Sequence, residues 1–475
     1  VFVPFYTRSM VYTMPEFLER RYNPQSRTIL SVISLVSYVL TKVAVTVYAG
    51  GLVFQQVFGI KELWGIDFFW IAAIGLVVLT ALYTIFGGMK SVLYTSVLQT
   101  PILLLGSLII LVLGFKELGG WDEMMRVCGA VTVNDYGDTM TNLIRSNDDA
   151  NFPWLGALIG SAIIGFWYWC TDQFIVQRVL SGKNEMEARR GTIFGAYLKL
   201  LPVFLFLIPG MIAFALHQKY IGAGGEGFLP MLANGTANAD AAFPTLVAKL
   251  LPAGVKGLVV CGILAALMSS LASLFNSSAM LFTIDFYKRF RPETPEKKLV
   301  GIGQVATVVI VILGILWIPI MRSVGDVLYT YLQDVQSVLA PGIAAAFLLG
   351  ICWKRTSAQG GMWGLIAGMV IGLTRLGAKV YYSNAGEVAD STFKYLFYDM
   401  NWLFFCGWMF LFCIIVVIVV SLATKAPTAE KIQGLVFGTA TKEQKAATRA
   451  SWNHWDIIHT VIILAITGAF YWYFW

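Results

Sequence analysis

Five small residues in the stretch 262–286 share one face of a predicted helix: Ala266, Ser269, Ser270, Ser273 and Ser277. Na⁺ is a hard cation that takes oxygen ligands, and the two adjacent hydroxyls with the Ala266 carbonyl one turn away supply three. The same spacing suits close packing of two membrane helices, in which each hydroxyl bonds to a carbonyl one turn earlier. The spacing alone leaves both interpretations open.

A second polar cluster lies in the apolar stretch 154–176, which contains Trp167, Tyr168 and Trp169 and then Asp172. Three consecutive aromatic residues cannot all face one direction on a helix, so at least one should face inward. Indole and phenol rings stack on the apolar faces of a sugar, while their N–H and O–H groups bond to its hydroxyls. An aromatic belt near the inner membrane surface explains the run equally well. Glycines at 160 and 165 permit a break in this helix.

Other polar residues also interrupt apolar stretches, where burying an ionisable group is costly without a partner or a cavity. Lys199 either reaches the inner membrane surface or points into a cavity, where it can donate to a hydroxyl. Lys42 requires a partner that the sequence does not name. Gln333 and Gln336 are three residues apart on one helix face, ahead of Pro341, which removes a backbone hydrogen bond.

Composition indicates an all-α polytopic membrane protein. Of the 475 residues, 57% are hydrophobic and 13% are charged, and the mean hydropathy is +0.71. Eleven apolar stretches are long enough to be membrane spans, at about 27–58, 67–87, 91–115, 154–176, 191–216, 257–286, 299–321, 327–351, 359–377, 402–424 and 454–474. The net charge is +7, and the basic residues lie mostly in short loops between these stretches. Basic residues in such loops orient membrane helices, so the charge does not indicate nucleic-acid binding.

The distribution of basic residues predicts the topology of the loops. We expect 117–153 and 217–256 to be external loops and 426–451 to be a cytoplasmic loop of a single membrane transport domain, 1–475. Most cysteines lie in apolar stretches, so no disulfide framework is expected, and the three histidines form no metal-binding spacing. The sequence contains no nucleophile–base pair and no phosphate-binding loop, so we do not expect this protein to be an enzyme.

Long, gap-free motifs along the whole chain resemble the solute:sodium symporter family, and most closely its sodium/glucose cotransporter branch of bacterial type. They are YTMPEFLERRY (12–22), LYTIFGGMKSVLYTSVLQT (82–100), FWYWCTDQFIVQRVLSGKN (166–184), YLKLLPVFLFLIPGM (197–211), LAALMSSLASLFNSSAMLFTIDFY (264–287) and YLQDVQSVLAPGIAAAFLLGICWKR (331–355). The resemblance implies fourteen helices on an inverted five-plus-five, LeuT-like repeat, with the substrate near the membrane midplane. Eleven spans then imply that three N-terminal helices, including the first core helix, precede this chain.

Transferred position by position, the resemblance implies roles for individual residues. The implied Na⁺ ligands are the carbonyl of Ala266 and the hydroxyls of Ser269 and Ser270. The implied sugar contacts are Lys199, Trp169, Gln333 and, at a position where relatives carry a small residue, Gln336. The implied inner gate is Tyr168, which stacks on the sugar, and the implied outer gate is Tyr329.

The resemblance predicts a multi-pass symporter of the plasma membrane, the bacterial inner membrane, that couples Na⁺ entry to uptake of a neutral sugar of the glucose or galactose type. Its partners are the sugar, sodium and membrane lipid, without nucleic acid, and the sequence specifies neither the sugar nor an oligomeric state. The alternatives are a symporter of myo-inositol, an acidic sugar or a monocarboxylate, and a sodium-coupled sugar sensor or channel. Ser96 and Ala272 stand where relatives that use a second sodium carry Asp and Thr, which predicts one Na⁺ per sugar.

Overall fold

Helices make up most of the computed structural model, which describes residues 2–9, 11–232, 235–324, 327–385 and 389–474. Within these ranges, the side chains at 8, 83, 85–93, 95, 98 and 322–324 are not described. The chain divides into two compact units. Unit 1 comprises Val1–Lys42, Asn147–Gly195 and Ser277–Leu464, and unit 2 comprises Val43–Ser146, Ala196–Asn276 and Ala465–Trp475.

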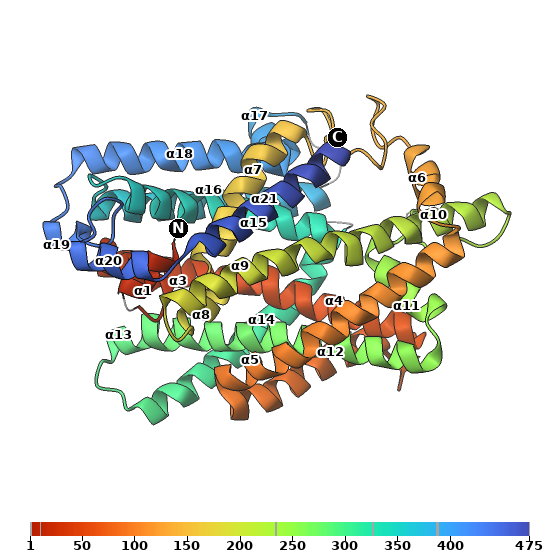
Figure 1. Cartoon of the computed structure of the whole chain (residues 1–475), viewed down its shortest axis with the longest axis horizontal. Helices are drawn as coiled ribbons and strands as arrows, with labels where there is room; N and C mark the ends of the chain where they lie inside the picture. Colours follow the sequence, from red (N-terminus) through yellow and green to blue (C-terminus); the bar gives the residue numbers. More distant parts are fainter. Residues whose placement is uncertain (1, 10, 233–234, 325–326, 386–388, 475) are drawn as a thin grey trace. The chain divides into compact units, whose positions relative to one another are not determined.

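Many of the helices are labelled in Figure 1. In chain order the elements are α1 (Val3–Ser9), α2 (Met14–Arg21), α3 (Pro24–Ser37), η1 (Tyr38–Val43), α4 (Ala44–Phe58), β1 (Glu62–Leu63), β2 (Ile66–Asp67), α5 (Phe68–Leu118), α6 (Trp121–Gly129), α7 (Trp154–Phe166), η2 (Trp167–Thr171), α8 (Gln173–Leu180), α9 (Glu185–Pro202), η3 (Val203–Leu207), α10 (Ile208–Gly222), η4 (Ala239–Ala241), α11 (Ala242–Leu250), α12 (Ala253–Met280), η5 (Leu281–Tyr287), α13 (Lys288–Phe290), α14 (Glu296–Val324), α15 (Leu328–Cys352), α16 (Ala358–Asn384), α17 (Thr392–Lys394), η6 (Tyr395–Asp399), α18 (Trp402–Ala423), α19 (Ala429–Ile432), α20 (Lys442–Ala450) and α21 (His454–Tyr473).

The centre of unit 1 is α15, which packs against α7, α16 and α18. Nearly every residue of α15 from Asp334 onward is buried. Two glycines let α15 and α16 approach closely, because a Cβ atom on Gly368 would lie 2.6 Å from the Cα of Gly342. The helix carrying two of the predicted sugar contacts is therefore held tightly on several sides.

A buried arginine completes the C-terminal end of α15. Arg21 donates from Nε to the Gly350 carbonyl at 2.7 Å and from Nη2 to the Trp353 carbonyl at 3.3 Å. The neighbouring Tyr22 hydroxyl donates to the Ala346 carbonyl at 2.7 Å, and burial raises the pKa of this phenol to about 12. The last carbonyls of a helix have no partner within it, and a cation at this end also complements the helix dipole.

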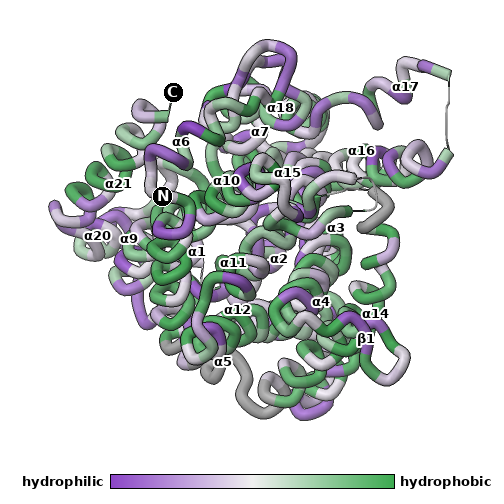
Figure 2. Tube along the Cα trace, turned by 90° about the vertical axis from the view of Figure 1, so that its right-hand side faces the viewer, coloured by the Kyte–Doolittle hydropathy of each residue, from purple (hydrophilic) through white to green (hydrophobic). Residues whose placement is uncertain are grey.

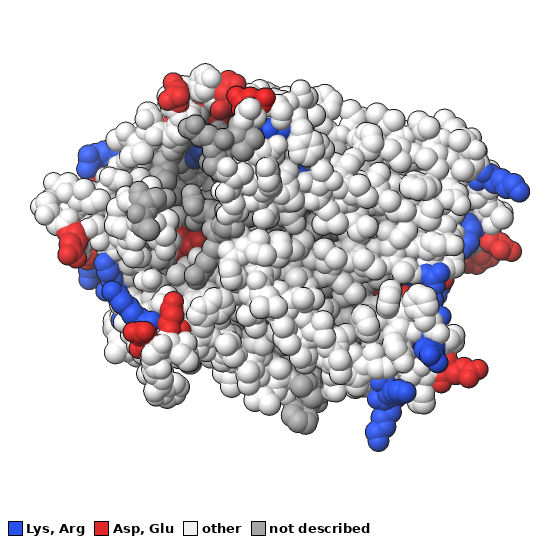
Figure 3. Space-filling model, turned by 180° about the vertical axis from the view of Figure 1, so that it is seen from behind, with Lys and Arg blue, Asp and Glu red and all other residues white. Residues whose placement is uncertain are grey.

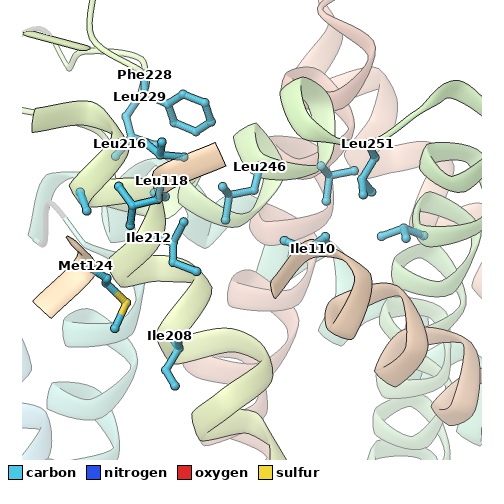
Figure 4. Close-up of a cluster of buried hydrophobic side chains, with 14 of the residues drawn as sticks. Ile110, Leu118, Met124, Ile208, Ile212, Leu216, Phe228, Leu229, Leu246 and Leu251 are labelled. Carbon is cyan, nitrogen blue, oxygen red and sulfur yellow. The ribbon is translucent and has the colours of Figure 1, made fainter. Parts of the chain in front are cut away.

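The core of unit 2 is a cluster of buried apolar side chains, part of which Figure 4 draws. Ile110 and Leu118 come from α5, Ile212 and Leu216 from α10, and Leu246 from α11. Unit 2 is therefore held together chiefly by apolar packing of helices that are distant in the sequence.

Each of the eleven predicted spans overlaps an apolar helical segment. Ten such segments among the described residues are long and apolar enough to cross a membrane, and Phe68–Leu82 is a shorter apolar helix. The spans predicted at 67–87 and 91–115 both lie within α5, which has no non-helical residue between them. Figure 2 shows hydrophobic residues along most of α14, and the face in Figure 3 is dominated by residues that are neither acidic nor basic. These are properties of membrane-spanning helices.

The predicted loops contain short ordered elements. The segment 117–153 includes α6 and a bridge between Thr132 and Thr139, and the segment 217–256 includes α11 and a bridge between Met231 and Ala237. In the segment 426–451, α20 begins with a capping box between Thr441 and Gln444. The strands β1 and β2 form a hairpin whose two turn residues both have positive φ.

Two helices contain residues that disturb helical geometry. α15 continues through Pro341, whose missing N–H does not end the helix, and nearby helices bury α15 on both sides of that residue. The helix 154–171 does not break at the glycines, because Gly160 lies against α18, where a Cβ atom would come within 2.7 Å of the Leu403 carbonyl oxygen. This glycine permits close packing, and the break comes later, at Asp172.

Candidate functional site

The predicted aromatic cluster lies where a membrane helix is interrupted in unit 1. α7 continues into η2, a π-helical segment, and the chain then leaves the helical conformation at Asp172, with φ −76° and ψ 123°. The Asp172 carboxylate caps the next helix, α8, by accepting a hydrogen bond from the Phe174 N–H at 3.1 Å. Short π-helical segments often mark functional sites, because they displace side chains from the regular helical pattern.

The three aromatic residues of η2 point in different directions, as the sequence predicts. Trp167 is buried, Tyr168 is half-buried and Trp169 is 49% exposed. The rings of Tyr168 and Trp169 meet edge to face, with centroids 5.2 Å apart. Two amphipathic rings beside a helix break are suited to contact a polar solute that also has apolar faces.

Lys42 pairs with Asp172, a partner that the sequence alone does not identify. The Lys42 ammonium forms an ion pair with Oδ2 of Asp172, which is buried, and the Lys42 side chain is only 9% exposed. The ammonium also lies 4.3 Å from the Phe174 ring centroid and 5.5 Å from that of Tyr168. The Tyr38 hydroxyl donates to Oδ1 of Asp172 at 3.2 Å. A charged pair therefore fixes the break next to the proposed inner gate.

The predicted sugar contacts of α15 lie near its first turns. Gln333 is half-buried and donates from Nε2 to the Tyr329 hydroxyl at 2.8 Å, whereas Gln336 is buried. Tyr329 is exposed, and its ring centroid lies 6.5 Å from that of Phe152. α15 also packs against η2. The structure thus brings the predicted glutamines and aromatic residues onto two neighbouring elements of unit 1.

The buried Asp334 beside these glutamines pairs with two cations of α16. Its Oδ2 lies 2.5 Å from Nζ of Lys379, and its Oδ1 lies 3.6 Å from Nη2 of Arg375. Arg375 is fully buried, donates to the Met400 carbonyl at 2.7 Å and lies 4.1 Å from the Phe405 ring centroid. The sequence analysis missed this cluster, although an arginine inside an apolar stretch with a lysine four residues later was a usable signal.

A second buried carboxylate that the sequence analysis missed lies in η5. Oδ1 of Asp285 accepts from Nε of Arg27 at 2.7 Å and from the Thr13 hydroxyl at 2.9 Å. Arg27 also pairs with Glu19 at 2.6 Å. These bonds connect α2, α3 and η5 through charged groups.

The predicted sodium ligands lie on α12 in unit 2. Ser269 is buried, and its hydroxyl oxygen lies 2.6 Å from that of Ser96 on α5. Ser270, one residue later, is exposed, and Ala266 is half-buried. Ser273 is completely buried, so the serine stripe contains both packed and accessible hydroxyls.

The remaining predicted positions are also in unit 2. Lys199 is exposed on α9, and Ala272 is buried on α12. In that part, no three His, Cys, Asp or Glu side chains come together in a way that would hold a metal ion. A cation bound at α12 would therefore be held by hydroxyl and carbonyl oxygens.

Comparisons with known proteins all match this chain to sodium-coupled transporters. The sequence model of the sodium:solute symporter family matches residues 1–368. The chain is 36% identical to the sodium/mannose cotransporter of Bos taurus over 496 residues, which covers 100% of this chain and 82% of that protein. It is 37% identical to sodium/glucose cotransporter 1 of Ovis aries and 35% identical to sodium/myo-inositol cotransporter 2 of Homo sapiens, over 90% and 92% of this chain. It spans 66% of the length of each of these two relatives.

A solved structure of a Na⁺-coupled sialic acid symporter in a substrate-bound outward-open state has the same fold. The TM-score is 0.68 at 21% identity, covering 90% of this chain and 80% of that one, and it confirms the predicted fold class. The family consists of transporters in which Na⁺ is the coupling ion. With ten helices in the described part of the chain that are long and apolar enough to span a membrane, this is a multi-pass membrane protein, as expected for one of the plasma membrane. The chain belongs to the sodium:solute symporter family.

Proposed function

We propose that this protein couples Na⁺ entry to the uptake of a neutral sugar by alternating access. The observation that carries the proposal is the placement of amphipathic rings and amides on two packed elements of unit 1. Tyr168 and Trp169 lie at the helix break of η2, and Gln333 and Gln336 lie on the neighbouring α15. Rings that contact CH faces and amides that bond to hydroxyls together suit a sugar. The names of the mannose, glucose and myo-inositol cotransporters among the relatives support the same class.

The individual roles in this proposal are those that the family resemblance implies. Tyr168 closes the sugar site toward the inside and Tyr329 closes it toward the outside. Gln333 exchanges its bond with the Tyr329 hydroxyl for a bond to the sugar, so that no buried amide is left unpaired. Lys199 is a further proposed contact of the sugar.

Sodium binds, in this proposal, to the hydroxyls of Ser269 and Ser270 and the carbonyl of Ala266. The buried hydroxyl pair of Ser269 and Ser96 supports an oxygen-lined position, and the exposure of Ser270 leaves its hydroxyl accessible to an entering ion. A membrane potential of 100 mV supplies about 2.3 kcal/mol for each charge that enters. This free energy supports a sugar gradient of roughly fiftyfold.

One Na⁺ accompanies each sugar, because Ser96 lacks the carboxylate, and Ala272 lacks the hydroxyl, that the resemblance associates with a second ion at these positions. The dependence of uptake on sodium concentration should then be hyperbolic, with a Hill coefficient near one. A coefficient near two, or a reversal potential that shifts with sodium as expected for two ions, would overturn this stoichiometry.

A second candidate, symport of an acidic sugar, is favoured by one observation. Arg375 and Lys379 place two positive charges against the single negative charge of Asp334, next to Gln333 and Gln336. An anionic substrate would balance the remaining charge. The hydrogen bonds of Arg375 to the Leu396 and Met400 carbonyls instead favour a structural role and a neutral substrate.

Uptake into proteoliposomes separates these functions. We would measure accumulation of labelled mannose, glucose, myo-inositol and a hexuronate with an inward Na⁺ gradient, and again with K⁺ in place of Na⁺. The proposal expects sodium-dependent accumulation of a neutral sugar above equilibrium. Accumulation of the hexuronate alone supports the second candidate, and equilibration without accumulation indicates a channel or a sensor.

A further inference from the structure

An apolar groove of about 670 Å³ runs along the exposed side of α14 in unit 1. Leu35 of α3 and Phe282 of η5 form one wall, and α14 contributes the rest, from Lys298 to Ile310. The groove is open where Gly301 has no side chain, because a Cβ atom there would meet nothing within 4 Å. Lys298 is the only charged residue among the described residues that line it.

The length and position of the groove match one half of a lipid bilayer. From Lys298 to Ile310 a helix rises about 18 Å, and half of the hydrocarbon core is about 15 Å thick. The apolar residues lie beyond Lys298 toward the middle of α14, so an acyl chain fits along them in an extended conformation. The groove is therefore matched to a single lipid tail in one leaflet.

The charge at the end of the groove specifies the kind of lipid. Segment 288–298 contains five basic and two acidic residues, a net charge of +3, which places this end of α14 at the cytoplasmic surface. Lys298 is exposed and belongs to none of the ion pairs among the described residues. Basic residues at this surface attract anionic headgroups.

We propose that this groove binds one anionic phospholipid of the inner leaflet. One acyl chain lies between α14 and the wall formed by Leu35 and Phe282, and the headgroup phosphate accepts hydrogen bonds from the Lys298 ammonium. α14 is apolar on its exposed side, so an ordinary lipid can contact it anywhere. The lysine beside the hollow at Gly301 makes this position selective.

The test is native mass spectrometry of the full chain released from nanodiscs that contain equal amounts of phosphatidylglycerol and phosphatidylcholine. Lys298→Gln removes the headgroup partner, and Gly301→Phe fills the hollow. Lys297→Gln is the matched control for charge, because Lys297 is also exposed but does not line the groove. Gly75→Phe is the matched control for bulk, because a Cβ atom there also meets nothing within 4 Å.

We expect about one retained phosphatidylglycerol per wild-type chain, and about tenfold less in the Lys298 and Gly301 variants. Both controls should retain it, and added inorganic phosphate should not displace it. The proposal is overturned if phosphatidylcholine is retained equally, if Lys298→Gln behaves like Lys297→Gln, or if free phosphate competes. It is also overturned if the Gly301 variant loses a dimer instead of a lipid, since the groove would then be an interface between copies of this chain.

Discussion

The two units differ in the charge of their buried polar side chains. Every buried Asp and Arg among the described residues belongs to unit 1: Arg21, Asp149, Asp172, Asp285, Asp334, Arg375 and Asp456. The buried polar residues of unit 2 are Thr80, Thr84, Ser107, His217, Thr245, Ser269 and Ser273, of which none carries a carboxylate or a guanidinium. Unit 1 thus contains buried ion pairs and buried charged groups bonded to the backbone, whereas the described interior of unit 2 is held by apolar packing and by uncharged polar side chains.

Most of the proposed sugar contacts and all of the proposed sodium ligands lie in different units. Four of the five proposed sugar contacts lie in unit 1, where charged pairs hold the helix break at Asp172 and the first turns of α15. All three proposed sodium ligands lie in unit 2. A sodium ion there would be the one full charge within that interior, in the part of the chain that is described. The comparison therefore predicts that stability, sodium affinity and sugar affinity respond to different substitutions.

The largest effect is expected from breaking a buried ion pair of unit 1. Asp172→Asn keeps an oxygen for the Phe174 N–H and the Tyr38 hydroxyl but leaves Lys42 without its counter-charge. We expect a loss of about 3–5 kcal/mol in the free energy of unfolding, measured by thermal denaturation in detergent. Adding Lys42→Met to this variant should restore much of the loss. A single variant as stable as the wild type would show that unit 1 does not depend on this charge.

The second largest effect is expected on the sodium affinity, from substitutions in unit 2 that leave the protein folded. Ser269→Ala and Ser270→Ala each remove a proposed ligand oxygen, and the apparent Na⁺ affinity for uptake should fall about a hundredfold, or ~2.7 kcal/mol. Ser107→Ala, another buried serine of unit 2, should leave it unchanged. The Ser270 variant is decisive, because this exposed side chain has little packing to lose. Unchanged sodium dependence in both variants would leave the stripe a helix-packing surface.

A smaller effect is expected at the sugar contact of unit 1. Gln333→Ala should weaken the apparent sugar affinity by about 1–3 kcal/mol, since a substrate hydroxyl loses its partner, while the sodium affinity stays the same. Tyr329→Phe keeps the amide and removes only its resting partner, so its effect on sugar affinity should be smaller. The measurement is competition for sodium-driven uptake. Wild-type sugar affinity in the Gln333 variant would contradict the assignment.

The smallest effect is expected from the surface charges of unit 2. Arg126 and Glu123 form an exposed ion pair at 2.7 Å on α6. Arg126→Gln should change neither the melting temperature nor the uptake measurably, because solvent screens such pairs. A clear destabilisation would mean that charge also supports unit 2, and the contrast between the units would then be weaker.

The sequence predicted the parts of this protein that depend on local patterns. Hydropathy located the apolar helices, and helical spacing placed Ser269 and Ser273 on one face of α12. It did not identify the partners of buried charges, because these pairs form between distant segments. Lys42 and Asp172 are 130 residues apart, and Arg27 and Asp285 are 258 apart. Nor did it show that Ser269 is buried while Ser270 is exposed, because this depends on which neighbouring helix covers each side of α12.

The cap on α15 has a consequence for biosynthesis. Arg21 is made 329 residues before Gly350, the carbonyl to which it donates. At about 5–20 residues per second, this interval lasts roughly 15–65 s. During this time the Arg21 guanidinium has no helix end to bind, so it must stay in water or among lipid headgroups. The segment around Arg21 thus reaches its final position only after α15 has been made, and chains that stop before α15 should expose this segment to proteases.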